Sequence, residues 1–175
     1  FTAAGVVNAA SFLSGAAVPG EIVSIFGTGL GPGAGQSGAL NPGTGRLNSA
    51  VADVTVTFNG VRAPLFFVSQ GQINAQAPFE MAGQSSAAVV VTYQNASSPP
   101  VTVPVGAARP GIFARPGSSQ GIVLNQDGSV NSPANPIARG QAVVIFATGQ
   151  GVLNPPLATG ELAPPSPLSS AGQIV

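Results

Sequence analysis

The sequence contains no cysteine, histidine, lysine or tryptophan, and its only tyrosine is Tyr93. Without cysteine the chain has neither disulfides nor thiol chemistry. A serine or threonine nucleophile would lack its usual His or Lys base, and zinc and haem would lack their preferred nitrogen and sulfur ligands. These absences exclude most catalytic arrangements. We therefore expect a protein that is not an enzyme and that uses no cofactor and no metal.

Charged residues are also rare, at 6% of the chain against about 25% in an average soluble domain. Five Arg balance three Glu and two Asp, so the formal net charge is zero. So little positive charge argues against a nucleic-acid partner. Mean hydropathy is +0.38, yet no run approaches the roughly 18 apolar residues of a membrane helix, so we expect no membrane insertion. Low charge gives little colloidal repulsion, which favours self-association.

Two carboxylates could still act together as a glycosidase pair. The acids are instead spread among turns and strand ends, so we expect them to be solubilising surface groups. They are Glu21, Asp53, Glu80, Asp127 and Glu161.

The absence of lysine leaves few cleavage sites for trypsin-like proteases, and two of the five arginines, Arg109 and Arg115, precede proline. This composition suits an extracellular or cell-surface location. The start of the chain at Phe1 lacks a basic segment and an apolar core of a signal peptide. We interpret the chain as a mature or excised segment.

An internal repeat is the strongest signal in the sequence. Residues 20–31 align with residues 140–151, with seven of twelve positions identical. A similar flank, 7–11 and 130–134, precedes each copy. A period of about 120 residues indicates a tandem domain duplication, because solenoid repeats are much shorter.

The first copy shows about seven short strands separated by turns. Val54, Val56 and Phe58 alternate with polar residues, the period-2 pattern of a half-buried strand. Asn59-Gly60 is a tight-turn pair. This spacing predicts an all-β, immunoglobulin-like sandwich. Another strand is expected to carry Val23 and Ile25 on one face and to stop at the Gly-rich loop 27–45, and further strands are expected at 63–68, 72–77, 87–93 and 101–105.

The second copy begins near Ile122, turns at Asp127-Gly128 and continues into an expected strand at 142–147. The segment corresponding to residues 57–106 of the first copy has no counterpart before Val175. We predict a complete sandwich at 1–108 and a partial second unit at 109–175, whose strands are completed by another chain or by further residues.

Three motifs resemble the IPT/TIG class of immunoglobulin-like domains: the runs at 23–31, 54–60 and 73–78. More narrowly, the runs at 6–12, 19–27 and 71–76 resemble the Solibacter-type C-terminal domain of acidobacterial secreted proteins. The resemblance implies an extracellular or surface-attached module of unassigned biochemical role, in which the second half normally continues into further strands.

Several residues are candidates for an assembly interface through sheet edges. An amide row alternates with apolar side chains on one expected strand, and the second copy contributes apolar residues. The candidates are Gln72, Ile73, Asn74, Ala75, Gln76, Val143, Ile145, Phe146, Ile174 and Val175. The amide row also fits an ordinary exposed polar face. Asn95 begins a glycosylation sequon, Asn95-Ala96-Ser97.

Two functions fit these features. The first is a non-enzymatic extracellular structural protein that self-assembles by β-strand sharing into a filament or surface layer. The second is an adhesion or recognition module for protein or glycan at the C-terminus of a larger secreted protein. The scarcity of aromatic side chains argues against sugar binding by stacking. The expected partner is therefore the chain itself, with surface proteins or glycans as alternatives.

Overall fold

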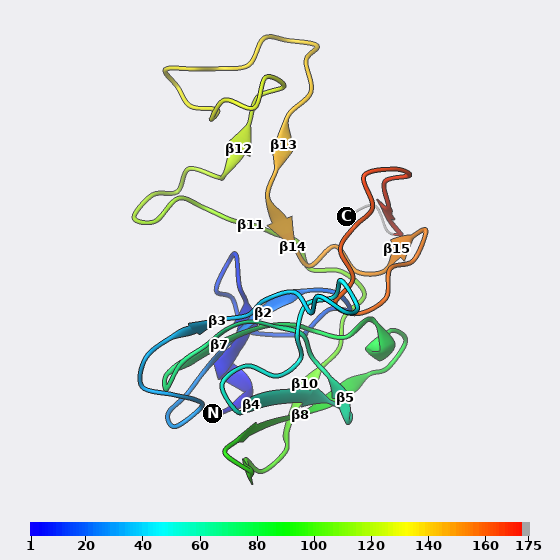
Figure 1. The fold of residues 1–175 in the computed structure, drawn as a ribbon. Helices are drawn as coiled ribbons and strands as arrows, with labels where there is room; N and C mark the ends of the chain where they lie inside the picture. Colours follow the sequence, from blue (N-terminus) through cyan, green and yellow to red (C-terminus); the bar gives the residue numbers. More distant parts are fainter. Residues whose placement is uncertain (173–175) are drawn as a thin grey trace.

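The computed structural model describes residues 1–172 and contains a two-layer β-sandwich built from the first hundred residues (Figure 1). One sheet has the strand order β1-β2-β7-β6-β3, and the other has the order β10-β8-β4-β5, with β9 paired to β8. The elements of this part are η1 Ala3–Gly5, β1 Val6–Asn8, β2 Ile22–Phe26, β3 Gln36–Ser37, β4 Val54–Phe58, β5 Val61–Arg62, β6 Leu65–Val68, β7 Gln72–Gln76, η2 Phe79–Met81, β8 Ser86–Tyr93, β9 Ala96–Ser97 and β10 Val101–Pro104.

The core lies between the two sheets and follows the period-2 pattern of the sequence. Val54, Val56 and Phe58 of β4 point inward and are fully buried, whereas the threonines between them are half-buried. Ile25 and Ile73 reach the same core from the facing sheet. Alternation therefore places every second side chain of these strands in the core, and the predicted sandwich strands are confirmed.

Asn59 and Gly60 form the turn between β4 and β5, where Phe58 pairs with Val61. Both turn residues have positive φ, 49° and 82°. This is the combination that two-residue hairpins with a right-handed twist require, and Asn-Gly is the pair that tolerates it best. The predicted tight turn is confirmed.

Residues 111–148 extend away from the sandwich as an arm of paired two-residue strands (Figure 1). The following segment, 149–172, returns to lie against the sandwich and contributes one further strand pair. The elements of both parts are β11 Gly111–Ile112, β12 Val123–Leu124, β13 Val144–Ile145, β14 Ala147–Thr148, β15 Leu153–Asn154 and β16 Ser170–Ala171. The fold is thus an immunoglobulin-like β-sandwich followed by the arm and the returning segment.

The arm repeats the first strand pair of the sandwich. Val6 pairs with Ile25 in β1 and β2, and Val123 pairs with Ile145 in β12 and β13. Because Ile25 and Ile145 are equivalent in the repeat, β12 occupies the position of β1. This corrects the flank alignment at 130–134, since that segment instead follows the Asp127-Gly128 turn as the second arm of a hairpin with β12.

The single strand predicted at 142–147 is wrong in one respect, because it is divided at Phe146. The Phe146 N–H donates to the Ile122 carbonyl beside β12, but its carbonyl accepts from Phe113 beside β11. The chain changes partner at this residue, so β13 and β14 are separate two-residue strands.

Candidate functional site: the open strand of the arm

The apolar strand of the second copy lies on the surface of the arm. Val143, Val144, Ile145 and Phe146 expose 41%, 54%, 49% and 44% of their area. In the first copy, Val23 and Ile25 are fully buried at the positions of Val143 and Ile145. The difference arises because no second sheet covers β12 and β13 within residues 1–172. Such a contiguous exposed apolar group is typical of an interaction site.

The main chain of β13 also has one edge without a partner strand in the described part of the chain. The Phe146 N–H donates to Ile122 at 3.1 Å, on the side of β12. Neighbouring residues of a strand direct their main-chain groups to opposite edges. Val143 and Ile145 therefore direct their N–H and C=O groups to the outer edge, which makes this edge competent to pair with another strand.

The prediction that residues 72–76 form a sheet edge is wrong. Strand β7 lies inside its sheet and pairs with β2 on one side and β6 on the other. Ile73 and Ala75 are fully buried in the core. The main chain of β7 is therefore satisfied within the sandwich, and the strand has no open edge to offer.

The amide side chains of β7 are engaged within the molecule. Asn74 Oδ1 accepts from Ser24 Oγ at 2.9 Å and from Gln72 Nε2 at 2.8 Å. Gln76 Oε1 accepts from the Gly160 N–H at 2.7 Å. The amide row thus joins β7 to β2 and fastens the returning segment to the sandwich. Of the remaining candidates, Ile174 and Val175 lie outside the described residues.

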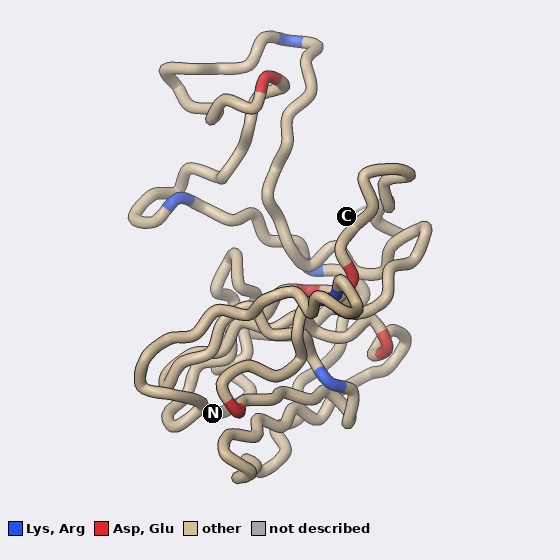
Figure 2. Tube along the Cα trace, viewed as in Figure 1, with Lys and Arg blue, Asp and Glu red and all other residues tan. Residues whose placement is uncertain are grey.

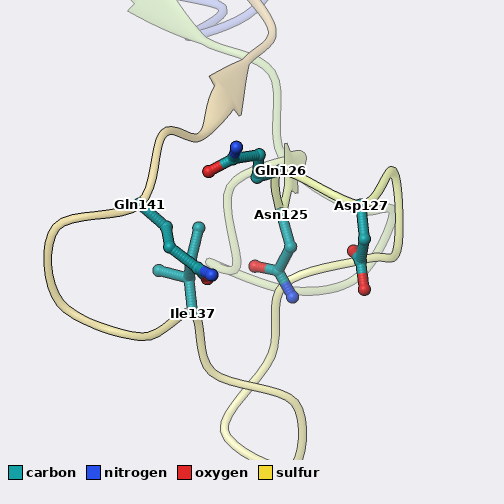
Figure 3. Close-up of a pocket in the computed structure, with 5 residues that line it drawn as sticks. All are labelled: Asn125, Gln126, Asp127, Ile137 and Gln141. Atoms are coloured by element: carbon teal, nitrogen blue, oxygen red, sulfur yellow. The ribbon is translucent and has the colours of Figure 1, made fainter.

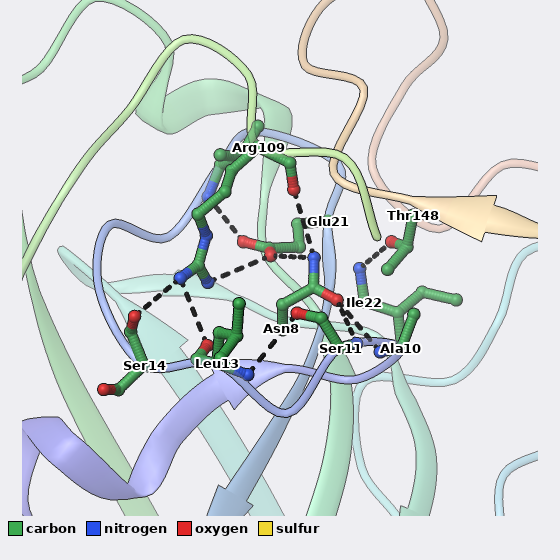
Figure 4. Close-up of polar contacts among 10 residues, drawn as sticks. Asn8, Ala10, Ser11, Leu13, Ser14, Glu21, Ile22, Arg109 and Thr148 are labelled. Atoms are coloured by element: carbon green, nitrogen blue, oxygen red, sulfur yellow. Dashed lines mark hydrogen bonds and ion pairs between the residues drawn. The ribbon is translucent and has the colours of Figure 1, made fainter. Parts of the chain in front are cut away.

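A polar cluster fixes the base of the arm to the sandwich (Figure 4). The Arg109 guanidinium contacts the fully buried Glu21 carboxylate, with Nη2 to Oε1 at 3.3 Å. Asn8 Nδ2 donates to the same Glu21 oxygen at 2.7 Å, and Val18 N–H donates to the other at 2.8 Å. Arg109 also donates to two carbonyls of the loop between β1 and β2, those of Leu13 and Ser14.

Thr148 adds a direct link between the two copies. Its Oγ1 accepts from the Ile22 N–H at 2.6 Å, and it is nearly fully buried. The Arg109 N–H donates to the Gly149 carbonyl at 2.8 Å. The base of the arm is thus held by main-chain and side-chain bonds on both of its strands, so we expect the arm to have a defined exit direction.

The expectation that Glu21 is a solubilising surface acid is wrong, although charged residues are otherwise sparse and scattered (Figure 2). Burial raises the pKa of the Glu21 carboxyl, and this outweighs the Val18 N–H, the Arg109 charge and the Asn8 amide, which lower its pKa. A buried acid with a cation and two amide donors is a structural ion pair. The available sequence signal was an acid directly preceding an apolar strand in a charge-poor chain.

The raised pKa of Glu21 predicts a pH dependence of stability. Unfolded Glu21 ionises near 4.5, whereas folded Glu21 retains its proton to higher pH, so its contribution to stability is greatest below 4.5 and is lost as pH rises through the folded pKa. We expect the Glu21→Gln variant to lack this decline. Urea unfolding from pH 4 to pH 8 measures it, with Asp53→Asn, at an exposed acid, as control. Parallel pH profiles for wild type and Glu21→Gln would contradict the assignment.

The hollow in Figure 3 lies in the arm and is lined by four polar side chains, those of Asn125, Gln126, Asp127 and Gln141, together with Ile137. Three of the four polar side chains, those of Asn125, Gln126 and Asp127, form hydrogen bonds within the arm. Asn125 Nδ2 donates to the Asn135 carbonyl, and Ser129 donates to Asp127, which lowers the Asp127 pKa. Within residues 1–172, no three His, Cys, Asp or Glu side chains cluster as metal ligands.

Asn95 lies exposed at the turn between β8 and β9. Its φ is 64° and that of Gln94 is 49°, values that Asn tolerates better than most residues. Ser97, the third residue of the sequon, is exposed on β9. The sequon is therefore accessible, and modification of Asn95 stays a prediction.

The two sheets, their strand order and the buried core between them define an immunoglobulin-like β-sandwich. Residues 6–105 match the family model of the IPT/TIG domain, which is more than half of the chain. The chain therefore belongs to the IPT/TIG family, as the motifs at 23–31, 54–60 and 73–78 predicted. No curated protein matches it. No helix among the described residues is long and apolar enough to span a membrane.

Proposed function

We propose that this chain is a non-catalytic extracellular or cell-surface module that binds protein by addition of a β-strand to its arm. The observation that carries the proposal is the outer edge of β13, where Val143 and Ile145 combine exposed apolar side chains with outward main-chain groups. Main-chain bonds at such an edge supply affinity and the alternating side chains supply specificity. IPT/TIG domains commonly serve as adhesion or recognition modules, which agrees with this role.

We also propose that the chain is divided into two units, 1–108 and 109–175, which the polar cluster around Arg109 joins. The sandwich provides a rigid support, because its own strands are paired and its core is filled. The arm provides the contact. The motifs at 6–12, 19–27 and 71–76 support a narrower assignment to the Solibacter-type C-terminal domains of secreted proteins.

Selection from a displayed library of linear peptides tests the function. We expect the immobilised chain to enrich extended peptides with apolar residues at alternate positions. Their binding should weaken at least tenfold in Ile145→Lys, because a charge at this position opposes strand addition. The control is Leu168→Lys, which changes an exposed apolar residue of the returning segment. Enrichment of peptides that bind both variants equally would contradict the proposal.

A second candidate is self-assembly by strand sharing into a filament or layer. The zero net charge and the four exposed apolar side chains of residues 143–146 favour it. Light scattering after size exclusion should then show association that rises with concentration and decreases in Ile145→Lys. A strictly monomeric species at all concentrations would exclude self-assembly while leaving partner binding intact.

A further inference from the structure

The first copy contains a complete example of the strand that is exposed in the second. Strand β2 lies between β1 and β7. On the β7 side, the Ala77 N–H donates to the Glu21 carbonyl at 2.8 Å, and the Gly27 N–H donates to the Gly71 carbonyl at 3.2 Å. Because main-chain direction alternates, Val23 and Ile25 also face β7. They pair with Ala75 and Ile73 respectively.

The second copy reproduces half of this arrangement. Strand β12 pairs with β13 in the register in which β1 pairs with β2. Val143 and Ile145 replace Val23 and Ile25 and direct their main-chain groups to the same side of the strand. Within residues 1–172 the place that β7 fills in the first copy is open.

We propose that the outer edge of β13 is an acceptor site for an extended partner segment of the Gln72–Gln76 type, bound antiparallel in the β2–β7 register. The inference rests on the proposed function and specifies its partner. In this register, the residue equivalent to Ile73 lies opposite Ile145, and the one equivalent to Ala75 lies opposite Val143. The two apolar positions are the same in both copies, so their side chains lie on the same face of the sheet as the apolar side chains of the added strand.

One position of the acceptor differs from its template and changes the preferred ligand. Ser24 of β2 donates to Asn74 at 2.9 Å, but its equivalent in β13 is Val144, which has no hydroxyl. An amide opposite Val144 would lose this hydrogen bond, whereas an apolar or β-branched side chain there would pack against Val144 across the strands. The acceptor therefore prefers an apolar or β-branched residue where β7 carries Asn74, and this distinguishes the partner segment from β7 itself.

A synthetic peptide with the sequence of residues 71–78 tests the inference by fluorescence anisotropy with the intact chain. In β7, the main chains of Ile73 and Ala75 face β2, whereas the Gln76 N–H donates to the Pro64 carbonyl on the β6 side. We expect N-methylation at Ile73 and Ala75 to weaken binding at least tenfold. N-methylation at Gln72 and Asn74 should change it less than threefold. These changes leave the protein unaltered, so its folding cannot affect the comparison.

Two further measurements complete the test. The Asn74→Val peptide should bind several times more tightly than the parent peptide. The Ile145→Lys substitution in the protein should weaken the binding of both peptides. Equal effects of the two N-methylation patterns would overturn strand addition at this edge. Failure of the peptides to bind, together with library selection of strands of another pattern, would overturn the inference and leave the proposed function standing. If neither the peptides nor any library sequence binds, both the inference and the proposed function are overturned.

Discussion

Replacing Ile25 by alanine is expected to lower the free energy of unfolding by about 2–5 kcal/mol, whereas the same replacement at Ile145 is expected to change it by less than about 0.5 kcal/mol. The two residues occupy equivalent positions of the repeat. Ile25 is fully buried between the sheets, and Ile145 is about half exposed on the arm. Truncation of Ile25 removes apolar burial and leaves a cavity, while truncation of Ile145 removes little buried surface.

Chemical unfolding of both variants measures this difference, and the identical chemistry of the substitutions makes each the control of the other. A loss at Ile145 comparable with that at Ile25 would mean that the arm is covered in solution. Repeating the measurement over a range of protein concentration then shows whether a second copy of the chain covers Ile145. A concentration-dependent loss would assign the cover to a second copy and would support the self-assembly hypothesis.

Removal of the Arg109 side chain is the second change with a large expected effect. The Arg109→Ala variant leaves Glu21 as a buried carboxylate without its cation, and breaking such a pair costs about 3 kcal/mol at neutral pH. Because the Arg109 charge lowers the pKa of Glu21, its loss raises that pKa further. Protonated Glu21 has no need of a cation, so the difference between variant and wild type should fall near pH 4 to the contribution of the Arg109 bonds to the Leu13 and Ser14 carbonyls.

Thermal or urea unfolding at pH 4 and pH 7 measures the effect. Arg139→Ala removes an exposed arginine of the arm and should change stability little at either pH. Arg109→Lys keeps the charge but lacks the guanidinium, whose several N–H donors reach both Glu21 and the loop carbonyls. We therefore expect an intermediate loss of stability. A deficit in Arg109→Ala that is equal at both pH values would show that packing, and not the ion pair, dominates.

The sequence alone determined the sandwich. Alternation in Val54–Phe58 gave one face of the core, and Asn59-Gly60 gave its turn, because both depend on interactions between residues close together in the chain. The repeat also located the strand equivalent to β2 in the second copy. Local pattern was sufficient wherever one strand face is buried and the other is solvated.

Only the tertiary structure decided which strand edges are open. The amide row of residues 72–76 fitted either an exposed polar face or a sheet edge, and the structure places β7 between β2 and β6. The apolar run at 143–146 has the pattern of a buried strand, but it is exposed. Strand order depends on pairings between distant segments, which a local pattern does not encode. Glu21 and Arg109 are separated by 88 residues of sequence. Their ion pair, which fixes the base of the arm, could therefore not be predicted from local pattern either.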